Sequence, residues 1–137
     1  MFGTDVAQEP ESLSNHKQGG TFAFHQGNLT KPSVPEDVVA AALSTFKSEH
    51  IDGLLNVAGI IDAYQAADTV DDDTWDRVIA VNLTAPLKMT RAAIPAIRKS
   101  GKGGVILNVA SKAGMSGGAS GIAYTSSKHG LVSVSGS

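Results

Sequence analysis

Residues 104–128 read GVILNVASKAGMSGGASGIAYTSSK, and this stretch decides the predicted fold. The aliphatic and β-branched residues of 104–111 are typical of a buried strand. The glycine-rich residues 114–121 predict a flexible crossing into the helix that follows. Ser111 then lies at the carboxyl end of the strand, which is where open α/β sheets bind their ligands.

Tyr124 and Lys128 lie four residues apart in the segment after this crossing. On a helix, residues with this spacing share one face, so the Lys128 ammonium would be held close to the Tyr124 phenol. A phenol has an ordinary pKa of about 10, so it exchanges protons at neutral pH far better beside a fixed cation. Taken alone, the pair is also typical of a solvated helix face. The strand that ends at Ser111 favours the catalytic interpretation.

Other apolar runs predict three further strands. Phe2–Asp5 is typical of the tail of a strand, and residues 21–25 and 50–57 of two more. We expect the 50–57 strand to be buried. No internal repeat is present, and the glycine-rich crossing is interpreted as an active-site loop and not as a domain linker.

Helical patterns lie between these strands. Ser33 and Glu36 form a capping-box pattern, with Pro35 tolerated in the first helical turn. An apolar stripe follows at helical spacing: Val38, Val39, Ala42, Leu43 and Phe46. The alternation of strands and helices implies a parallel sheet with helices on both faces.

A longer helical region follows residue 70. Its start carries three carboxylates that suit a helix dipole, and its end carries a basic cluster. Pro86 and Pro95 should break or kink this region. The carboxylates are Asp71, Asp72 and Asp73; the first residues expected on the buried face are Trp75, Val78 and Ile79; the basic residues are Arg91, Arg98, Lys99 and Lys102.

Together these segments resemble the short-chain dehydrogenase/reductase family, which moves a hydride between NAD(H) or NADP(H) and an alcohol or carbonyl. The stretch Asn56-Val57-Ala58-Gly59 resembles the Asn-Asn-Ala-Gly signature of that family, although Val57 replaces its second Asn. Val81-Asn82-Leu83 resembles the helix segment that supplies the active-site Asn. Ser111, Tyr124 and Lys128 fall on the remaining catalytic positions, and the resemblance covers nearly the whole chain.

The resemblance implies the fold class: α/β, an incomplete Rossmann-type doubly wound parallel sheet containing about strands 2 to 5 of the family fold. Residues 1–137 would form a single partial NAD(P)-binding domain, truncated at both ends. The family's opening strand and its glycine-rich turn have no counterpart here, nor has the substrate region after the Tyr124 helix. The opening strand is central in the 3-2-1-4-5-6 order, so its absence leaves strands 2 and 4 of the family fold without the partner that they share. The edges of these two strands must pair with each other, pair with another chain or remain exposed. We therefore expect this fragment to fold poorly or to bind cofactor weakly.

The resemblance also implies four catalytic roles. Tyr124 would be the general acid/base that exchanges a proton with the substrate oxygen. Ser111 would hydrogen-bond and orient that oxygen. Lys128 would favour the Tyr124 phenolate and bind the nicotinamide ribose hydroxyls. Asn82 would hold a water that continues a proton path from Lys128 to solvent.

Six positions outside the catalytic set are implied to bind the cofactor. Asn56, Ala58 and Gly59 belong to the signature loop, and Gly59 lets the backbone approach the ligand closely. Asp5, as an acidic residue at a strand end, would accept hydrogen bonds from the adenosine ribose hydroxyls. That favours NAD and leaves NADP possible. Asn28 and Leu29 occupy the position where the family usually has Asp-Val or Asp-Leu beside the adenine.

Each of these residues also has a simpler interpretation. Asn82 can be a solvated or capping Asn, and Gly59 an ordinary turn glycine. Ser111 can cap the segment that follows it. Asp5 can be an ordinary terminal carboxylate. The joint order of the motifs favours the functional interpretation over these alternatives.

The composition excludes several classes of protein. An apolar content of 42% and a net charge of −2 are those of a soluble globular domain, not of a nucleic-acid-binding or polybasic membrane protein. No apolar run approaches the ~18 residues of a membrane span, and no secretory signal is seen, so we expect a cytoplasmic protein. The chain has no cysteine, and its four histidines lack metal-ligand spacing, so no metal site is expected.

Three functions remain open at this point. The first is an NAD(P)-dependent oxidoreductase acting on a small-molecule alcohol or carbonyl. We expect this fragment to be inactive alone and the full-length protein to be a homo-oligomer, either a dimer or a tetramer. The second is a non-catalytic product that acts through the helices that form the family's oligomer interface. The third is a related epimerase or dehydratase, which the Asn-Val-Ala-Gly signature disfavours. The identity of the substrate stays open, because the family's specificity lies largely in segments absent here.

Overall fold

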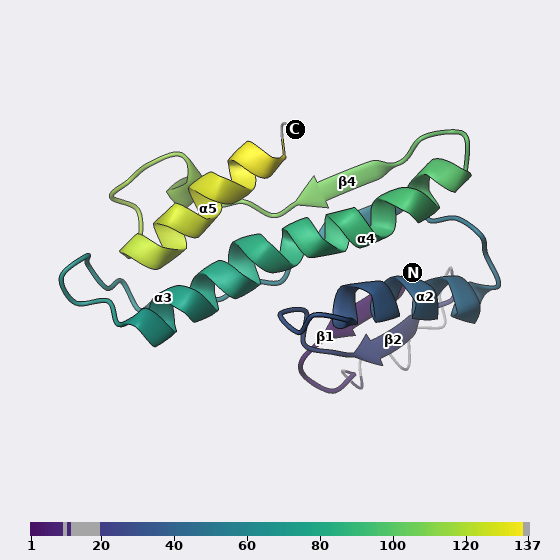
Figure 1. Ribbon diagram of the computed structural model, residues 1–137, viewed down its shortest axis with the longest axis horizontal. Helices are drawn as coiled ribbons and strands as arrows, with labels where there is room; N and C mark the ends of the chain where they lie inside the picture. Colours follow the sequence, from purple (N-terminus) through teal and green to yellow (C-terminus); the bar gives the residue numbers. More distant parts are fainter. Residues whose placement is uncertain (10, 12–19, 136–137) are drawn as a thin grey trace.

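The computed structural model describes residues 1–9, 11 and 20–135 (Figure 1). Its strands are β1 (Phe2–Asp5), β2 (Ala23–Gln26), β3 (Gly53–Asn56) and β4 (Val105–Asn108). Its helices are α2 (Val34–Phe46), α3 (Asp72–Ile79), α4 (Ala85–Lys99) and α5 (Ile122–Val134). A π-helical segment, η1 (Ala80–Thr84), joins α3 to α4, and a 3-10 turn, η2 (Lys112–Gly114), follows β4. All the strands expected from the sequence are present, most of them shorter than predicted.

The strands form two separate parallel pairs. β1 pairs with β2 in the register Phe2↔Ala23, and β3 pairs with β4 in the register Gly53↔Val105. In the described part of the chain β1 and β3 do not pair with each other. Of the three outcomes expected for a missing central strand, the structure shows unpaired edges. The predicted parallel α/β order is therefore present, but as two half-sheets.

A hollow of about 590 Å³ lies between the two half-sheets and is lined by residues of both β1 and β3. Apolar side chains of α2 and α4, such as Phe46 and Met89, form much of its wall. Thr4 of β1 also lies on this wall, and its buried Oγ1 has no hydrogen-bond partner. The sequence predicts the missing strand at this place in the sheet.

One face of the β3–β4 pair is open, so the prediction that both strands are buried is wrong. Leu55 is 65% exposed, Val105 65% and Leu107 46%. Side chains two residues apart share one face of a strand, so these residues form a single bare apolar surface. The opposite face meets α4, where the Asn56 amide donates to the Pro86 carbonyl at 3.5 Å. In the described residues helices therefore cover only one face of this pair, not both as the sequence predicts.

The capping box predicted at the start of α2 does not form. Ser33 is the N-cap residue, but its backbone is already helical (φ −89°, ψ −17°) and its side chain makes no capping bond. A capping side chain needs an extended backbone to reach the first amides. Pro35 lies in the first turn as predicted, buried with Val38.

A continuous helical run extends from α3 through η1 to α4 and crosses the middle of the molecule (Figure 1). Its start agrees with the prediction: the Asp71 carboxylate accepts a hydrogen bond of 2.7 Å from the Thr74 amide. Val78 is fully buried, whereas Trp75 is 37% exposed and lies at the edge of the buried face, contrary to prediction.

Neither proline interrupts this run. Pro86 lies in the first turn of α4, directly after η1, where no α-helical hydrogen bond from its nitrogen is required. Pro95 lies inside α4, where the buried side chains of Ala93, Ala96 and Ile97 hold the helix on both sides of it. The prediction allowed a break or a kink, and its first part is wrong, since no break occurs at either proline.

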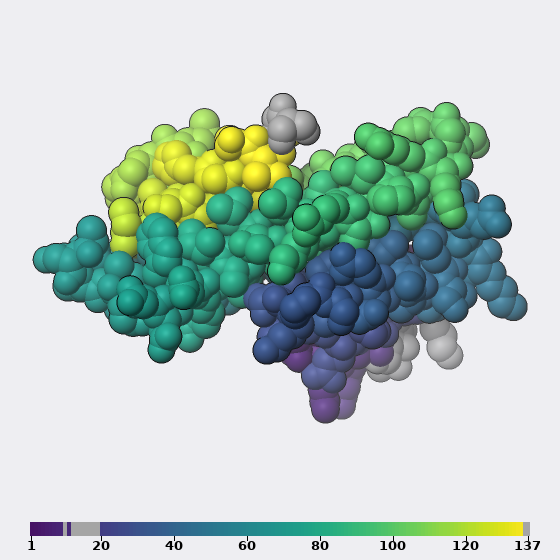
Figure 2. Space-filling view, viewed as in Figure 1, coloured from purple at the N-terminus to yellow at the C-terminus, as the bar shows by residue number. Residues whose placement is uncertain are grey.

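Helix α5 lies alongside α3 and η1 and forms the second layer of this half of the molecule (Figures 1 and 2). Leu131 is 1% exposed, and Gly130 allows Leu83 of η1 to come close, since a Cβ there would lie 2.9 Å from Leu83 Cδ2. Among the described residues, none of the helices has the length and apolar character that crossing a membrane requires.

Candidate active site

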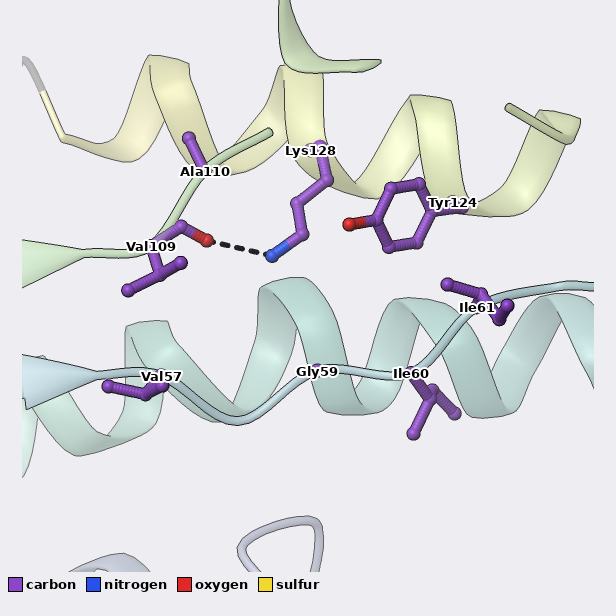
Figure 3. A pocket seen from close by; sticks show the side chains of 8 residues that line it. All are labelled: Val57, Gly59, Ile60, Ile61, Val109, Ala110, Tyr124 and Lys128. Atoms are coloured by element: carbon purple, nitrogen blue, oxygen red, sulfur yellow. Dashed lines mark hydrogen bonds between the residues drawn. The ribbon is translucent and has the colours of Figure 1, made fainter. Parts of the chain in front are cut away.

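Tyr124 and Lys128 lie on the same face of α5, as the spacing predicts. The Lys128 Nζ is 5.7 Å from the centroid of the Tyr124 ring. Both side chains point into the space between α5 and the loop that follows β3 (Figure 3). The structure therefore brings the amine close to the Tyr124 ring, as the spacing of the two residues predicts.

Lys128 is buried, with 4% of its surface exposed. Its ammonium donates a 2.8 Å hydrogen bond to the Val109 carbonyl at the end of β4. Burial lowers the pKa of the Lys128 ammonium from its usual 10.5, because desolvation penalises the charged form. An ammonium has three donors, and the described structure uses one of them on protein atoms, which leaves two for a ligand.

Asn82 is fully buried in η1, and its amide holds the loop after β3. Its Oδ1 accepts a 2.8 Å hydrogen bond from the Ile60 amide, and its Nδ2 donates one of 2.8 Å to the Ile60 carbonyl. Nδ2 also donates to Ser127 Oγ at 3.1 Å, and Ser127 Oγ donates to the Tyr124 carbonyl at 2.7 Å. Asn82 thus joins the loop to α5, and it is not the solvated Asn of the simpler interpretation.

Gly59 completes this cluster. A Cβ at Gly59 would lie 3.5 Å from Asn82 Oδ1 and 3.6 Å from Lys128 Nζ. The structure therefore brings Gly59, Asn82 and Lys128 together, although they are distant in sequence.

Ser111 precedes η2 and caps it. Its Oγ accepts a 3.2 Å hydrogen bond from the Ala113 amide, which is the role that the simpler interpretation assigns. Capping uses one lone pair of the hydroxyl, and its O–H remains available to a substrate oxygen. Gly114 fixes the approach of this turn to α5, since a Cβ there would lie 2.8 Å from the Lys128 carbonyl oxygen.

A pocket of about 550 Å³ lies at the cluster. Aliphatic side chains dominate its walls, and Tyr124 and Lys128 provide the polar groups. One wall consists of Val57, Gly59, Ile60 and Ile61, and the other of Val109, Ala110, Tyr124 and Lys128 (Figure 3). The site fits a nicotinamide ribose: the glycine leaves its rim open, the two spare Lys128 donors suit hydroxyls, and the apolar walls suit a flat ring.

The other two residues predicted in the signature loop lie elsewhere. The Asn56 amide donates to Asn108 Oδ1 at 2.8 Å and so joins β3 to β4. Ala58 lies on the wall of the hollow between the half-sheets. Neither lines the pocket beside Tyr124.

The residues predicted to bind the adenosine lie at the ends of β1 and β2. Asp5 is exposed at the end of β1, and its Oδ1 accepts from the Ala7 amide at 2.9 Å. Asn28 follows β2, and its Oδ1 accepts from the Thr30 amide at 3.0 Å. Leu29 lies on the wall of the hollow. These residues belong with the β1–β2 pair, whereas Tyr124 and Lys128 lie beside the β3–β4 pair.

One buried carboxylate, Asp62, was not predicted from the sequence; it is 2% exposed beside the first turn of α5. It stands in no recognisable motif, so no local signal could have marked it. In the part of the chain that the structure describes, no group of three or more metal-ligating side chains converges.

Comparison with known protein families identifies the family to which this chain belongs. The family model for the short chain dehydrogenase matches residues 4–137. The chain belongs to the short-chain dehydrogenase family. The crystal structure of NADH-dependent reductase A1-R′ complexed with NAD aligns with this member at a TM-score of 0.84 and 28% identity, over 96% of this chain and 58% of that one. The predicted incomplete Rossmann-type fold is confirmed.

Two curated relatives of this short-chain dehydrogenase are similar to it over nearly its whole length. Short-chain dehydrogenase/reductase cdmF of Talaromyces verruculosus is 50% identical over 134 residues, which make up 98% of this chain and 50% of that protein. Asnovolin H dehydrogenase nvfC of Aspergillus novofumigatus is 48% identical over 132 residues, 96% of this chain and 49% of that protein. The chain thus spans about half the length of the curated relatives it matches.

Proposed function

We propose that this chain carries the proton-transfer half of an oxidoreductase that moves a hydride between NAD(H) and an alcohol or carbonyl substrate. The observation that carries the proposal is the pairing of Tyr124 with the buried Lys128 on α5, across the pocket from Gly59. Bound NAD(H) would supply or accept the hydride.

Tyr124 is the proton donor and acceptor in this proposal. During carbonyl reduction its hydroxyl protonates the substrate oxygen as that oxygen gains charge, and during alcohol oxidation the phenolate takes the proton back. The Lys128 Nζ lies 5.7 Å from the centroid of the Tyr124 ring, and its positive charge stabilises the negative charge on the Tyr124 oxygen.

Three other residues support this step. The Ser111 hydroxyl, held by η2, donates to the substrate oxygen and orients it toward Tyr124. The spare donors of Lys128 bind the ribose hydroxyls. Asn82 keeps the loop wall in place through its hydrogen bonds to Ile60. In this proposal it would also hold the water that continues the proton path to solvent.

The cofactor preferred in this proposal is NAD. The Asp5 carboxylate at the end of β1 accepts hydrogen bonds from ribose hydroxyls and repels a 2′-phosphate, which disfavours NADP. Asn28, Leu29, Asn56 and Ala58 would take part at the adenosine end and in shaping the loop. Assembly of the whole protein into a dimer or tetramer, and its cytoplasmic location, belong to the same proposal.

A chimera tests the function directly. The matching 132 residues of asnovolin H dehydrogenase are replaced by those of this chain, giving what we call the grafted enzyme. Turnover of asnovolin H is followed by the absorbance of NADH. Tyr124→Phe should lower kcat at least about 100-fold, because a proton donor is lost, and should leave the Kd for NADH nearly unchanged.

The second tyrosine of the chain provides the matched control. Tyr64 is 73% exposed, and Tyr64→Phe should leave kcat unchanged. Substantial turnover in the Tyr124→Phe enzyme would remove Tyr124 from the role of proton donor.

A further inference from the structure

Asp62 is a buried carboxylate that the proposed chemistry does not use. Its Oδ2 accepts a 2.9 Å hydrogen bond from the backbone amide of Tyr124, and its Oδ1 accepts one of 3.3 Å from the Tyr64 amide. Among the described residues no Lys, Arg or His forms an ion pair with it. A buried charge without a counter-ion is costly, so its hydrogen bonds must compensate for the lost solvation.

The amide that Asp62 binds belongs to the first turn of α5, where backbone N–H groups lack helical partners. The N-cap residue of α5 is Gly121, which has no side chain to satisfy them. Instead, the loop after β3 does so: Asp62 takes the Tyr124 amide, and the Gln65 carbonyl takes the Ile122 amide at 2.8 Å. A carboxylate at this end of a helix is also favoured by the helix dipole.

The space at Gly121 is fitted to this carboxylate. A Cβ there would lie 2.5 Å from Asp62 Cγ, far inside van der Waals contact. Gly121 has φ −67° and ψ 168°, which any residue adopts, so backbone conformation does not require glycine. The glycine is required because the Asp62 carboxylate occupies the position of its missing side chain.

The backbone directly after Asp62, which caps α5, is strained. Ala63 (φ 53°) and Tyr64 (φ 62°) both lie in the left-handed region, which non-glycine residues rarely adopt. Two such residues in succession persist only where surrounding contacts hold them. The hydrogen bonds from the loop to α5 supply those contacts.

We propose that Asp62 is a positioning residue for Tyr124, holding the first turn of α5 in register with the pocket wall. The inference rests on the proposed function, in which Tyr124 transfers the proton. Asp62 follows the wall residues Ile60 and Ile61 directly in sequence and binds the amide of Tyr124 itself. Together with the hydrogen bond from the Ile122 amide to the Gln65 carbonyl, this charge-assisted hydrogen bond joins the loop of the pocket wall to the helix that carries the phenol.

Hydrogen exchange of the grafted enzyme tests the cap without any catalysis, and it avoids the poor folding expected of the chain alone. Asp62→Ala should speed exchange of the Tyr124 amide at least about fivefold, the expected effect of losing a helix cap. The matched control is Asp71→Ala, which removes the carboxylate that caps α3 and should speed exchange in the first turn of α3 only. In the grafted enzyme, a Tyr124 amide that exchanges freely before any substitution, or equally slowly in Asp62→Ala, would overturn the proposal.

Kinetics of the grafted enzyme test the positioning. Asp62→Ala should lower kcat between about tenfold and 100-fold, as a small misplacement does, with the Kd for NADH nearly unchanged, whereas Asp71→Ala should keep kcat. The double variant Asp62→Ala, Gly121→Ser vacates the space at residue 121 and installs a local cap there. It should recover both amide protection and most of kcat.

The outcomes separate this inference from the function on which it rests. Loss of protection with an unchanged kcat, or restored protection without restored kcat, would refute a positioning role for Asp62. Full turnover in Tyr124→Phe would instead refute the proposed function, while the exchange results would still decide whether Asp62 caps α5.

Discussion

Replacement of Asn82 by alanine should destabilise the short-chain dehydrogenase fold more than any exposed polar substitution, because Asn82 connects three parts of the site. Its amide makes three hydrogen bonds from a fully buried position: two to the Ile60 backbone and one to Ser127. Each contributes a net stabilisation of about 1 kcal/mol, so the loss comes to about 3 kcal/mol. The buried Ser127 hydroxyl would also lose a donor.

This free energy is measured by thermal and urea unfolding of the grafted enzyme. For a protein of its size, 3 kcal/mol corresponds to a fall in Tm of roughly 6–12 °C. Asn82→Asp should be at least as harmful, since it places a carboxylate oxygen against the Ile60 carbonyl. Asn28→Ala is the control, because Asn28 is exposed and its side chain bonds, among described residues, only to the nearby Thr30. Surface changes of this kind usually cost within about 0.5 kcal/mol. A loss below about 1 kcal/mol for Asn82→Ala would refute the reasoning, because the three buried bonds together would then contribute less than is assigned to one of them.

Three further predictions concern charge and the open sheet. Burial lowers the pKa of Lys128, so between its folded pKa and 10.5 the unfolded chain binds more protons than the folded chain. The free energy of unfolding should therefore rise with pH across that window. Urea unfolding at several pH values measures this rise, which Lys128→Met should remove. The hydrogen bonds from the Thr74 backbone and hydroxyl hold the pKa of Asp71 below 3.8, so the stability that the Asp71 carboxylate adds should be lost as pH falls below that value. Unfolding followed by circular dichroism should show no such loss in acid for Asp71→Asn. The bare face of Leu55 and Leu107 should make the chain alone bind an apolar fluorescent dye, whereas the grafted enzyme, which completes the sheet, should not.

The predictable part of the site is the part that local spacing fixes. Tyr124 and Lys128 are four residues apart on one helix, so their proximity follows from helix geometry as soon as the helix is assigned. The cap on α3 was predictable for the same reason, because Asp71 and Thr74 lie within one turn.

Long-range features could not be predicted in this way. Asp62 and Tyr124 are far apart in sequence, and a single Asp in a loop carries no periodic signal. Even a local pattern fails when the backbone differs: Ser33 has the residue types of a capping box, but its helical dihedral angles direct the hydroxyl away from the amides. The sequence around Leu107 shows which residues are apolar, but it cannot show that they are exposed among the residues that the structure describes.

The division of the sheet explains why the proposed cofactor should bind weakly to the chain alone. The groups proposed for the adenosine end, Asp5 and Asn28, belong to the β1–β2 pair, whereas Gly59 and Lys128 belong with the β3–β4 pair. Within the described ranges no strand hydrogen bonds cross the hollow between the pairs, so a ligand that contacts both pairs must also fix their relative position and lose affinity accordingly. Energy transfer from Trp75 to NADH should therefore detect binding that is much weaker in the chain than in the grafted enzyme. Micromolar binding by the chain alone would show that α2 and α4 already hold the two pairs in place without a central strand.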